Sequence, residues 1–201
     1  MDRDRTIESV ESGASDARLV ATLAQAFQGD PALSWLLPNA AARARRLPLF
    51  FKVMAEQSRR RGTILASHDR GAVSLWYPPG KVVQPRFADL LDNLRLVGVF
   101  RSALPRGLKL AEAMYSHHPS PQEHDYLRYV GVAPEAQGKG WGGAIVRAGI
   151  ARAAQKGRGV LLETATPDNV AIYSRLGFEI ISEWTAPDDG PKFWTMVHPA
   201  P

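Results

Sequence analysis

The chain has 201 residues, a formal net charge of +5 and no cysteine, and 45% of its residues are apolar. This composition is typical of one globular domain, and it excludes disulfide bonds, thiolate metal sites and a cysteine nucleophile. Any acyl group would therefore pass directly from donor to acceptor. No apolar run reaches about 18 residues and no cationic start precedes an apolar block, so we expect a cytoplasmic protein without a membrane partner.

The positive charge would suit an anionic ligand, either a cofactor with several phosphates or a nucleic acid. Two arginine-rich runs, Arg43–Arg46 and Arg59–Arg61, lie along and at the end of one expected helix, without interleaved aromatic residues. A solvated helix face and a cationic last turn explain both runs. We therefore expect no nucleic-acid partner.

The first part of the chain predicts helices and one hairpin. Leu19, Leu23 and Phe27 recur at helical spacing after a possible cap at Ser15 or Asp16. The elements expected up to residue 123 are a strand at Thr6–Val10, this first helix, a helix from Pro31 through Trp35, a helix over Ala40–Arg60 ended by Gly62, a hairpin of Thr63–Ser67 and Gly71–Trp76, and helices over Phe87–Val97 and Leu108–Ser116. A break around Pro105–Gly107 should separate the last two helices.

From His124 the pattern changes to strand, glycine-rich bend, helix, strand, short helix and two final strands. The first strand should run to Val132, the helix to Lys156 and the next strand over Val160–Thr164. This order predicts an α/β (α+β) fold, with a mixed, mostly antiparallel sheet of about six to seven strands flanked by helices. No repeat or low-complexity linker divides the chain, so we expect a single domain over residues 1–201.

The glycine-rich bend, Gln137–Gly143, lies between a strand and the start of a helix. A helix start offers unpaired N–H groups and the positive end of the peptide dipoles, and glycines let a diphosphate approach them closely. The bend therefore predicts an anion cradle. Lys139 would add a point charge at its rim, or serves only solubility at the surface.

A second interpretation of the bend is a dinucleotide fingerprint. Gly138, Gly140 and Gly143 satisfy G-x-G-x-x-G, and Glu163 follows at a strand end. Against it, five residues separate the strand from the first glycine, and too little chain follows for a doubly wound fold with a substrate domain. A glycine turn with a structural role alone is the third interpretation.

Several motifs in this region resemble the GNAT superfamily of N-acetyltransferases, and within it the subgroup of puromycin N-acetyltransferase. The superfamily signature is Arg or Gln, two residues, Gly, one residue, and Gly or Ala, and it is matched by Gln137, Gly140 and Gly142. The further motifs that agree in order are Val130–Pro134, Leu162–Thr164, Asn169 with Tyr173, Leu176–Phe178, Gly190–Pro191 with Trp194 and Met196, and, more faintly, Ala26–Phe27 and Asp30–Pro31. Ala133 departs from the Asp that related sequences often carry, and the N-terminal half departs further.

The resemblance implies acetyl-CoA as co-substrate and a sheet that splays between its fourth and fifth strands. It implies that residues 124–201 form the acetyl-CoA-binding core and that residues 1–123 are a variable, acceptor-side part. The residues that it places at the cofactor are Val130, Gly131, Val132, Gln137, Gly138, Lys139, Gly140, Trp141, Gly142, Gly143, Asn169 and Tyr173. A backbone N–H of the fourth strand would hold the developing oxyanion.

The resemblance also makes Tyr173 the group that protonates the departing thiolate. Asn169 and Tyr173 are four residues apart and share one helix face, and Asp168 or Asn169 could cap that helix. Gly177 suits a left-handed helix end before Phe178. The alternative is that Tyr173 is a packing residue and Asn169 a cap alone.

The sequence gives weaker evidence for the base that deprotonates the acceptor amine. Glu163 and His124 are candidates, although a charged residue at a strand end is commonly solvated. His117, His118 and His124 lack the carboxylate partners and spacing of a metal site, so we expect no metal.

For the acceptor, the candidate residues are Asp30, Trp35 and Trp76, with Tyr77 and Tyr115 as further aromatics. Each has an alternative role, Asp30 as a helix cap and the aromatics as core. The expected partner is a small-molecule or peptide amine, bound by a monomer or homodimer. The alternatives are a CoA-binding module without turnover and a nicotinamide-dependent oxidoreductase.

Overall fold

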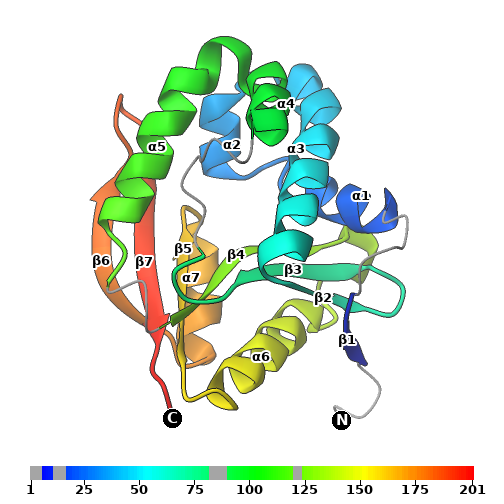
Figure 1. Ribbon diagram of the computed structural model, residues 1–201, viewed down its shortest axis with the longest axis vertical. Helices are drawn as coiled ribbons and strands as arrows, with labels where there is room; N and C mark the ends of the chain where they lie inside the picture. Colours follow the sequence, from blue (N-terminus) through cyan, green and yellow to red (C-terminus); the bar gives the residue numbers. More distant parts are fainter. Residues whose placement is uncertain (1–5, 11–16, 82–89, 120–123) are drawn as a thin grey trace.

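The computed structural model describes residues 6–10, 17–81, 90–119 and 124–201. The helices and strands of these residues are, in chain order, β1 (Ile7–Ser9), α1 (Ala17–Ala26), α2 (Pro31–Leu36), α3 (Ala40–Arg61), β2 (Thr63–Ser67), β3 (Ala72–Tyr77), α4 (Leu90–Phe100), α5 (Leu104–Ser116), β4 (His124–Val132), α6 (Trp141–Ala154), β5 (Gly159–Thr164), α7 (Pro167–Arg175), β6 (Glu179–Thr185) and β7 (Lys192–His198) (Figure 1). Short 3₁₀ turns, η2 (Arg101–Ala103) and η3 (Pro134–Ala136), precede α5 and the glycine-rich bend.

The strands form one seven-stranded sheet in the order β1-β2-β3-β4-β5-β7-β6. Only the β4–β5 pair is parallel among the described strands, and the other pairs are antiparallel. The expected mixed, mostly antiparallel sheet with flanking helices is therefore confirmed. A doubly wound dinucleotide fold needs a mostly parallel sheet, so the fingerprint interpretation of the glycine-rich bend is wrong.

The centre of the sheet opens between β4 and β5. The two strands pair from His124 against Gly159 to Tyr126 against Leu161. Beyond these residues, β4 pairs with β3 and β5 pairs with β7, and no described residue bridges the two strands. This is the splay that was expected between the fourth and fifth strands.

Helices cover both faces of the sheet, because each face carries its own apolar side chains. On one face, α1 and α3 bury residues such as Leu19 and Phe51. On the other face, α6 packs Ile145 against Leu162 and Met196 of the sheet. Successive strand residues point to opposite faces, so Tyr77, Tyr126 and Leu161 cluster on the side away from α6.

Most elements expected in the first part of the chain are confirmed, with one correction. Pro105–Gly107 does not break the helices, because Pro105 lies in the first turn of α5, where its missing N–H has no intrahelical partner to lose. The interruption is η2, immediately before it. The caps expected at Ser15 or Asp16, and the start of a helix at Phe87, lie outside the described residues.

None of the described helices combines the length and apolar character needed to cross a bilayer.

Candidate functional site

The open edge of β4 is shaped by a β-bulge. Leu75 pairs with Tyr129 and Trp76 pairs with Leu127, so Arg128 is the extra residue of β4. A bulged residue has no partner in the ladder of paired residues, and the strand bends at that point. Beyond the bulge, the N–H of Ala133 donates to Gly71 O at 2.8 Å. Because alternate residues face the same neighbour, Val130 and Val132 turn their main-chain groups toward the gap.

The glycine-rich bend leads from this edge to α6. Gly138 and Gly140 have φ angles of 71° and 78°, and Gly140 is the N-cap of α6. A Cβ added at Gly138 would have no neighbour within 4 Å, and one at Gly142 would meet only Val132 Cγ2, at 3.7 Å. The first N–H groups of a helix have no intrahelical partner, and the bare glycines leave room beside those of α6, as a diphosphate site requires. The residues present fit the phosphates of acetyl-CoA.

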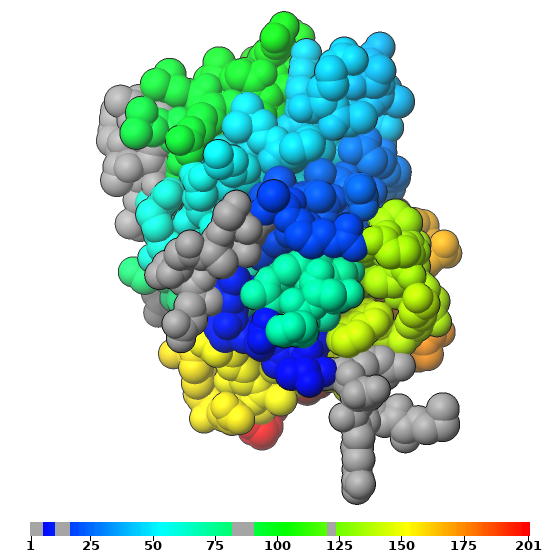
Figure 2. All heavy atoms as spheres, turned by 90° about the vertical axis from the view of Figure 1, so that its right-hand side faces the viewer, coloured from blue at the N-terminus to red at the C-terminus, as the bar shows by residue number. Residues whose placement is uncertain are grey.

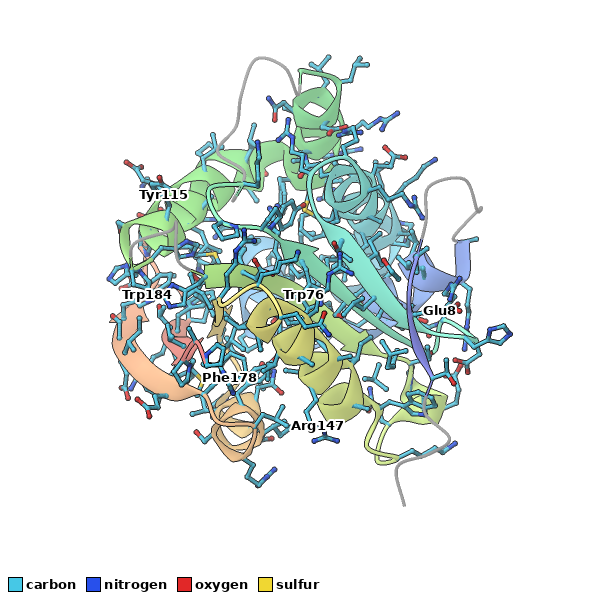
Figure 3. All side chains as sticks on the ribbon, turned by 60° about the horizontal axis from the view of Figure 1, so that its bottom comes forward. Glu8, Trp76, Tyr115, Arg147, Phe178 and Trp184 are labelled. Carbon is cyan, nitrogen blue, oxygen red and sulfur yellow. The ribbon has the colours of Figure 1, made fainter. Side chains whose placement is uncertain are left out.

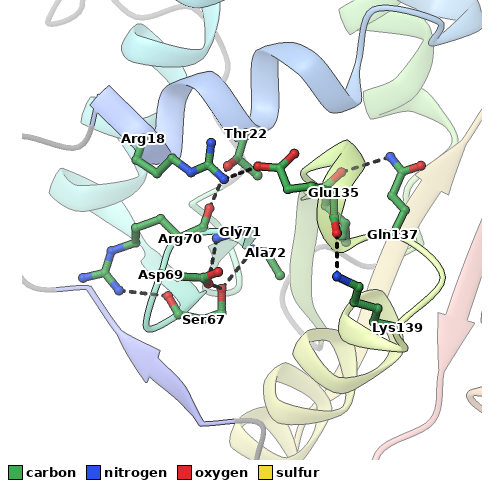
Figure 4. A network of polar contacts seen from close by, with 11 residues as sticks. Arg18, Thr22, Ser67, Asp69, Arg70, Gly71, Ala72, Glu135, Gln137 and Lys139 are labelled. Atoms are coloured by element: carbon green, nitrogen blue, oxygen red, sulfur yellow. Dashed lines mark hydrogen bonds and ion pairs between the residues drawn. The ribbon is translucent and has the colours of Figure 1, made fainter.

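Side chains around the bend hold it in place (Figure 4). Gln137 Nε2 donates to Val132 O at 3.1 Å, and Lys139 Nζ donates to Glu135 O at 2.8 Å. The Glu135 carboxylate pairs with Arg18 of α1, whose guanidinium holds the pKa of Glu135 below its usual value. Figure 2 shows α1, the β2–β3 turn and this bend side by side on one face. The main chain of the cradle is therefore preorganised, and Lys139 folds back onto it.

Gly131 explains how closely α1 approaches β4. A Cβ at Gly131 would lie 3.0 Å from Leu23 Cδ2 and 3.1 Å from Ala26 Cβ. Thr22 Oγ1 also donates to Arg70 O at 2.7 Å and ties α1 to the β2–β3 turn. Gly131 therefore contributes packing against α1, whereas its neighbours Val130 and Val132 turn their main-chain groups toward the gap.

Helix α7 places Tyr173 and Asn169. The N–H of Phe178 donates to Tyr173 O and that of Gly177 to Ser174 O, at 3.1 Å each, and Gly177 has a φ of 91°. These bonds form a Schellman motif. Tyr173 is half-buried, and burial raises its pKa to about 12. Its phenol is therefore protonated at neutral pH.

The expected cap of α7 is wrong. Thr166 occupies the N-cap without a side-chain bond, because Pro167 fixes the first helical position and moves Asp168 and Asn169 into the first turn. Asn169 Nδ2 instead donates to Thr164 Oγ1 at 3.4 Å. Asn169 and Tyr173 still share a face of α7.

Glu163 is not solvated. Its side chain is 1% exposed and pairs with His118 Nε2, from the turn after α5, whose side chain is 2% exposed. The ring of His118 lies 5.1 Å from that of Tyr126, centroid to centroid. Sequence reasoning considered His118 only as a metal ligand and missed this pair. The sequence offers one signal, a histidine pair between a helix and the strand that borders the gap.

His124 lies away from this cluster. It starts β4 beside Gly159, at the end where β4 and β5 are still paired, whereas Glu163 lies beyond the divergence of the strands. The structure therefore does not bring His124 together with Glu163, Tyr173 or the glycine-rich bend.

The candidate acceptor residues are separated by the sheet. Asp30 caps α2 by accepting from Leu33 N at 2.8 Å, and burial raises its pKa. The Asp30 charge also acts on Tyr129 of β4, on the face away from α6. Trp76, by contrast, lies against α6 (Figure 3). A Cβ at Gly149 would meet its ring, and its indole donates to Ser74 Oγ at 2.7 Å.

The other aromatic candidates have partners of their own. The guanidinium of Arg106 lies 5.2 Å above the ring of Trp35. Tyr77 accepts a hydrogen bond from Ser58 Oγ at 3.1 Å in the core. Tyr115 is 42% exposed on α5. Of this set, Asp30 is the residue with a carboxyl group, and its charge acts on the face of the sheet away from α6.

Among the described residues, no cluster of three or more histidine and carboxylate side chains could hold a metal ion.

Comparison with known proteins finds a family match within the second half of the chain. The model of the family described as acetyltransferase (GNAT) domain matches residues 108–180. This range contains β4, the glycine-rich bend, α6, β5 and α7. It therefore includes every residue expected at the cofactor.

Solved structures extend the likeness to the whole chain. A Corynebacterium glutamicum protein described as histone acetyltransferase HPA2 and related acetyltransferase is 26% identical, with a TM-score of 0.74 over 98% of this chain and 97% of that one. The Drosophila melanogaster polyamine N-acetyltransferase that forms N-acetylagmatine is 16% identical, with a TM-score of 0.58 over 96% and 99%. The Escherichia coli ribosomal-protein-S18-alanine N-acetyltransferase is 15% identical, with a TM-score of 0.52 over 98% and 94%. The last two share the fold.

Proposed function

Because the chain carries a GNAT acetyltransferase domain and is a transferase, we propose that it moves an acetyl group from acetyl-CoA to a primary amine. The transfer is a direct attack within a ternary complex. One observation carries the proposal: the open edge of β4 leads straight into a bend whose main chain is bare and held in the left-handed conformation at the start of α6.

The chain's main-chain groups bind the donor. The N–H groups of Gly138 to Gly143 hold the diphosphate, and the α6 dipole adds to their positive potential. Val130 pairs with the pantetheine arm through the groups it turns toward the gap. Val132 O already accepts from Gln137, so Val132 contributes its N–H. Asn169 approaches the arm from α7.

The bulge at Arg128 supports oxyanion binding. Arg128 has no partner residue in the β3–β4 ladder, and a main-chain N–H of this part of β4 polarises the thioester carbonyl. Such a donor contributes about 3 to 4 kcal/mol to the stability of the transition state. No side chain is needed for this step.

Tyr173 assists the leaving group. Its phenol is protonated because burial raises its pKa to about 12, whereas a free thiol ionises near a pKa of about 8.5. Complete proton transfer from the phenol to the released thiolate is thus uphill unless the phenol is reprotonated. Tyr173 therefore hydrogen-bonds to the sulfur as the C–S bond breaks and completes the transfer as solvent restores the phenol.

The acceptor is an amine that carries a positive charge in solution. The half-buried carboxyl group of Asp30 and the buried one of Glu163 lie on the face away from α6 and favour a cationic group. The Drosophila relative acts on a polyamine-like amine and the E. coli relative on a protein alanine, so both classes are candidates. We also propose that the chain belongs to the subgroup of puromycin N-acetyltransferase and forms a single domain over residues 1–201. We further propose that it is cytoplasmic and is a monomer or a homodimer.

The test is a screen for acetyl-CoA-dependent thiol release over agmatine, polyamines, aminoglycosides, amino acids and short peptides. Turnover with at least one amine, and mass-spectrometric detection of its acetylated product, is expected. Tight binding of acetyl-CoA in calorimetry without turnover of any amine would instead indicate a CoA-binding module. Absence of binding would refute the proposal altogether.

A further inference from the structure

His118 and Glu163 form a buried histidine–carboxylate pair beside the gap. Their side chains are 2% and 1% exposed, and the pair joins His118 Nε2 to Glu163 Oε1. Burial of a carboxylate carries a desolvation cost of several kcal/mol, which its partners must offset. A pair of this kind in a splayed sheet therefore calls for a functional explanation.

The second ring nitrogen of His118 has no partner. Nδ1 is buried and makes no hydrogen bond within the described part of the chain. Leaving a buried polar atom unsatisfied costs about 1 to 3 kcal/mol, and most such atoms in proteins are bonded to protein or to ordered water. Because Nε2 faces Glu163 Oε1, Nδ1 is the ring atom of His118 that is available to a water or a ligand.

The pair lies on the acceptor side of the sheet. Leu162 packs toward α6, so its neighbour Glu163 points to the opposite face, which also carries Leu161 and Tyr126. Glu163 belongs to the part of β5 that no longer pairs with β4. The cluster consequently borders the place where the thioester would lie.

We propose that His118 is the catalytic base that deprotonates the acceptor amine through Nδ1, directly or through one water, and that Glu163 is its positioning residue. The inference rests on the proposed acetyl transfer and replaces Glu163 as the base. Glu163 holds the Nε2 side of the ring, which leaves the Nδ1 lone pair to accept a proton.

The proposed transfer conserves atoms, electrons and charge. A proton of the acceptor R–NH₃⁺ moves to Nδ1, and the nitrogen lone pair then bonds to the thioester carbon. The C–S bond breaks, its electron pair leaves on sulfur, and Tyr173 protonates the sulfur. The surplus proton on the amide nitrogen restores the Tyr173 phenol through solvent, and His118 releases its proton to water. One proton is liberated for each amide formed from an ammonium group.

The titratable groups that face His118 come from three elements. Glu163 lies on β5, Tyr126 on β4 and Tyr115 on α5, with its ring 6.0 Å from that of His118. Burial and the charge of Glu163 raise the pKa of Tyr126 well above its usual value, against the opposing charge of Arg128. Tyr126 therefore stays protonated and does not accept the proton of the amine.

The kinetic test compares His118→Gln with His117→Gln, using an amine that the screen has shown to be acetylated. His118→Gln should lower kcat/KM on the order of 10²-fold and abolish the acidic limb of its pH profile, while acetyl-CoA affinity is unchanged. Glu163→Gln should lower kcat and shift that limb. His117, which stacks on Trp184 with centroids 4.6 Å apart, is the neighbouring histidine outside the cluster, and its variant should keep the wild-type profile.

An unchanged rate and pH profile in His118→Gln would overturn the inference, although wild-type turnover would leave the acetyltransferase proposal intact. If that variant does not fold, ¹⁵N NMR of the wild-type imidazole decides instead. The expected spectrum has the proton on Nε2 and a bare Nδ1 at the pH of maximal activity. A proton on Nδ1 at that pH would equally refute the role.

Discussion

The ring of Tyr173 packs edge-to-face on that of Phe178, with the centroids 5.6 Å apart and the planes at 61°. The contact is built into the Schellman motif of α7, because Phe178 also donates its N–H to Tyr173 O. Ring packing of this kind contributes about 0.5 to 1.5 kcal/mol beyond buried area. The phenol is thus fixed by main-chain geometry and by packing, and its hydroxyl is left for chemistry.

Replacement of Tyr173 by Phe should separate these two roles. Tyr173→Phe keeps the ring contact and removes the hydroxyl, so kcat should fall on the order of 10²-fold while the Kd of acetyl-CoA in calorimetry stays unchanged. Ser174→Ala removes a hydroxyl from the next, exposed position of α7 and should leave kcat unaltered. Full activity of Tyr173→Phe would remove Tyr173 from the mechanism.

Local patterns in the sequence predicted the donor side of the site well. Gly138, Gly140 and Gly177 all have a positive φ, and glycine is the residue that adopts this conformation without strain. The order of elements after His124 likewise follows from turn residues and from apolar periodicity. These signals act over a few residues, so one sequence suffices to find them.

The acceptor side depends on contacts between distant segments, and the sequence did not predict it. His118 and Glu163 lie on different elements and meet only because the end of α5 comes down beside β6 and β7 (Figure 1). Trp76 and Tyr77 are adjacent in the sequence, yet they point to opposite faces. The sheet order decides which side chains meet on one face beside the gap, and this order is not encoded in any short motif.

The charge of the anion cradle can be tested at Gly140. Gly140→Asp and Gly140→Asn introduce side chains of nearly equal size at the same φ of 78°, and both residues tolerate the left-handed region better than most. A carboxylate at a helix start favours the helix itself, but it repels a diphosphate. We expect Gly140→Asp to bind acetyl-CoA at least about tenfold more weakly than Gly140→Asn, a difference of about 1.4 kcal/mol.

Calorimetric titration measures both affinities, and circular dichroism checks that both variants are folded. Equal affinities in the two variants would show that the diphosphate does not lie at the start of α6.

The acceptor role of Asp30 can be tested without loss of its cap. Asn caps a helix as well as Asp does, so Asp30→Asn should retain the bond from Leu33 N while it removes the charge. The KM for a cationic amine should rise about tenfold, and the KM for acetyl-CoA should stay constant. Asn39→Asp makes the reverse change at the exposed cap of α3, where Asn39 accepts from Ala42 N, and should alter neither constant. An unchanged amine KM in Asp30→Asn would restrict Asp30 to capping.

The packing of α6 on the sheet predicts opposite effects of one substitution at two helical glycines. A Cβ at Gly149 would lie 1.9 Å from Trp76 Cζ2, whereas one at Gly98 of α4 would meet nothing within 4 Å. Gly149→Ala should therefore lower the free energy of unfolding by about 1 to 3 kcal/mol, because Trp76 or the helix must shift. Gly98→Ala should raise it by about 0.5 to 1 kcal/mol, because alanine favours the helix. Urea denaturation measures both changes, and a Gly149→Ala variant as stable as Gly98→Ala would contradict the close approach of α6 to Trp76.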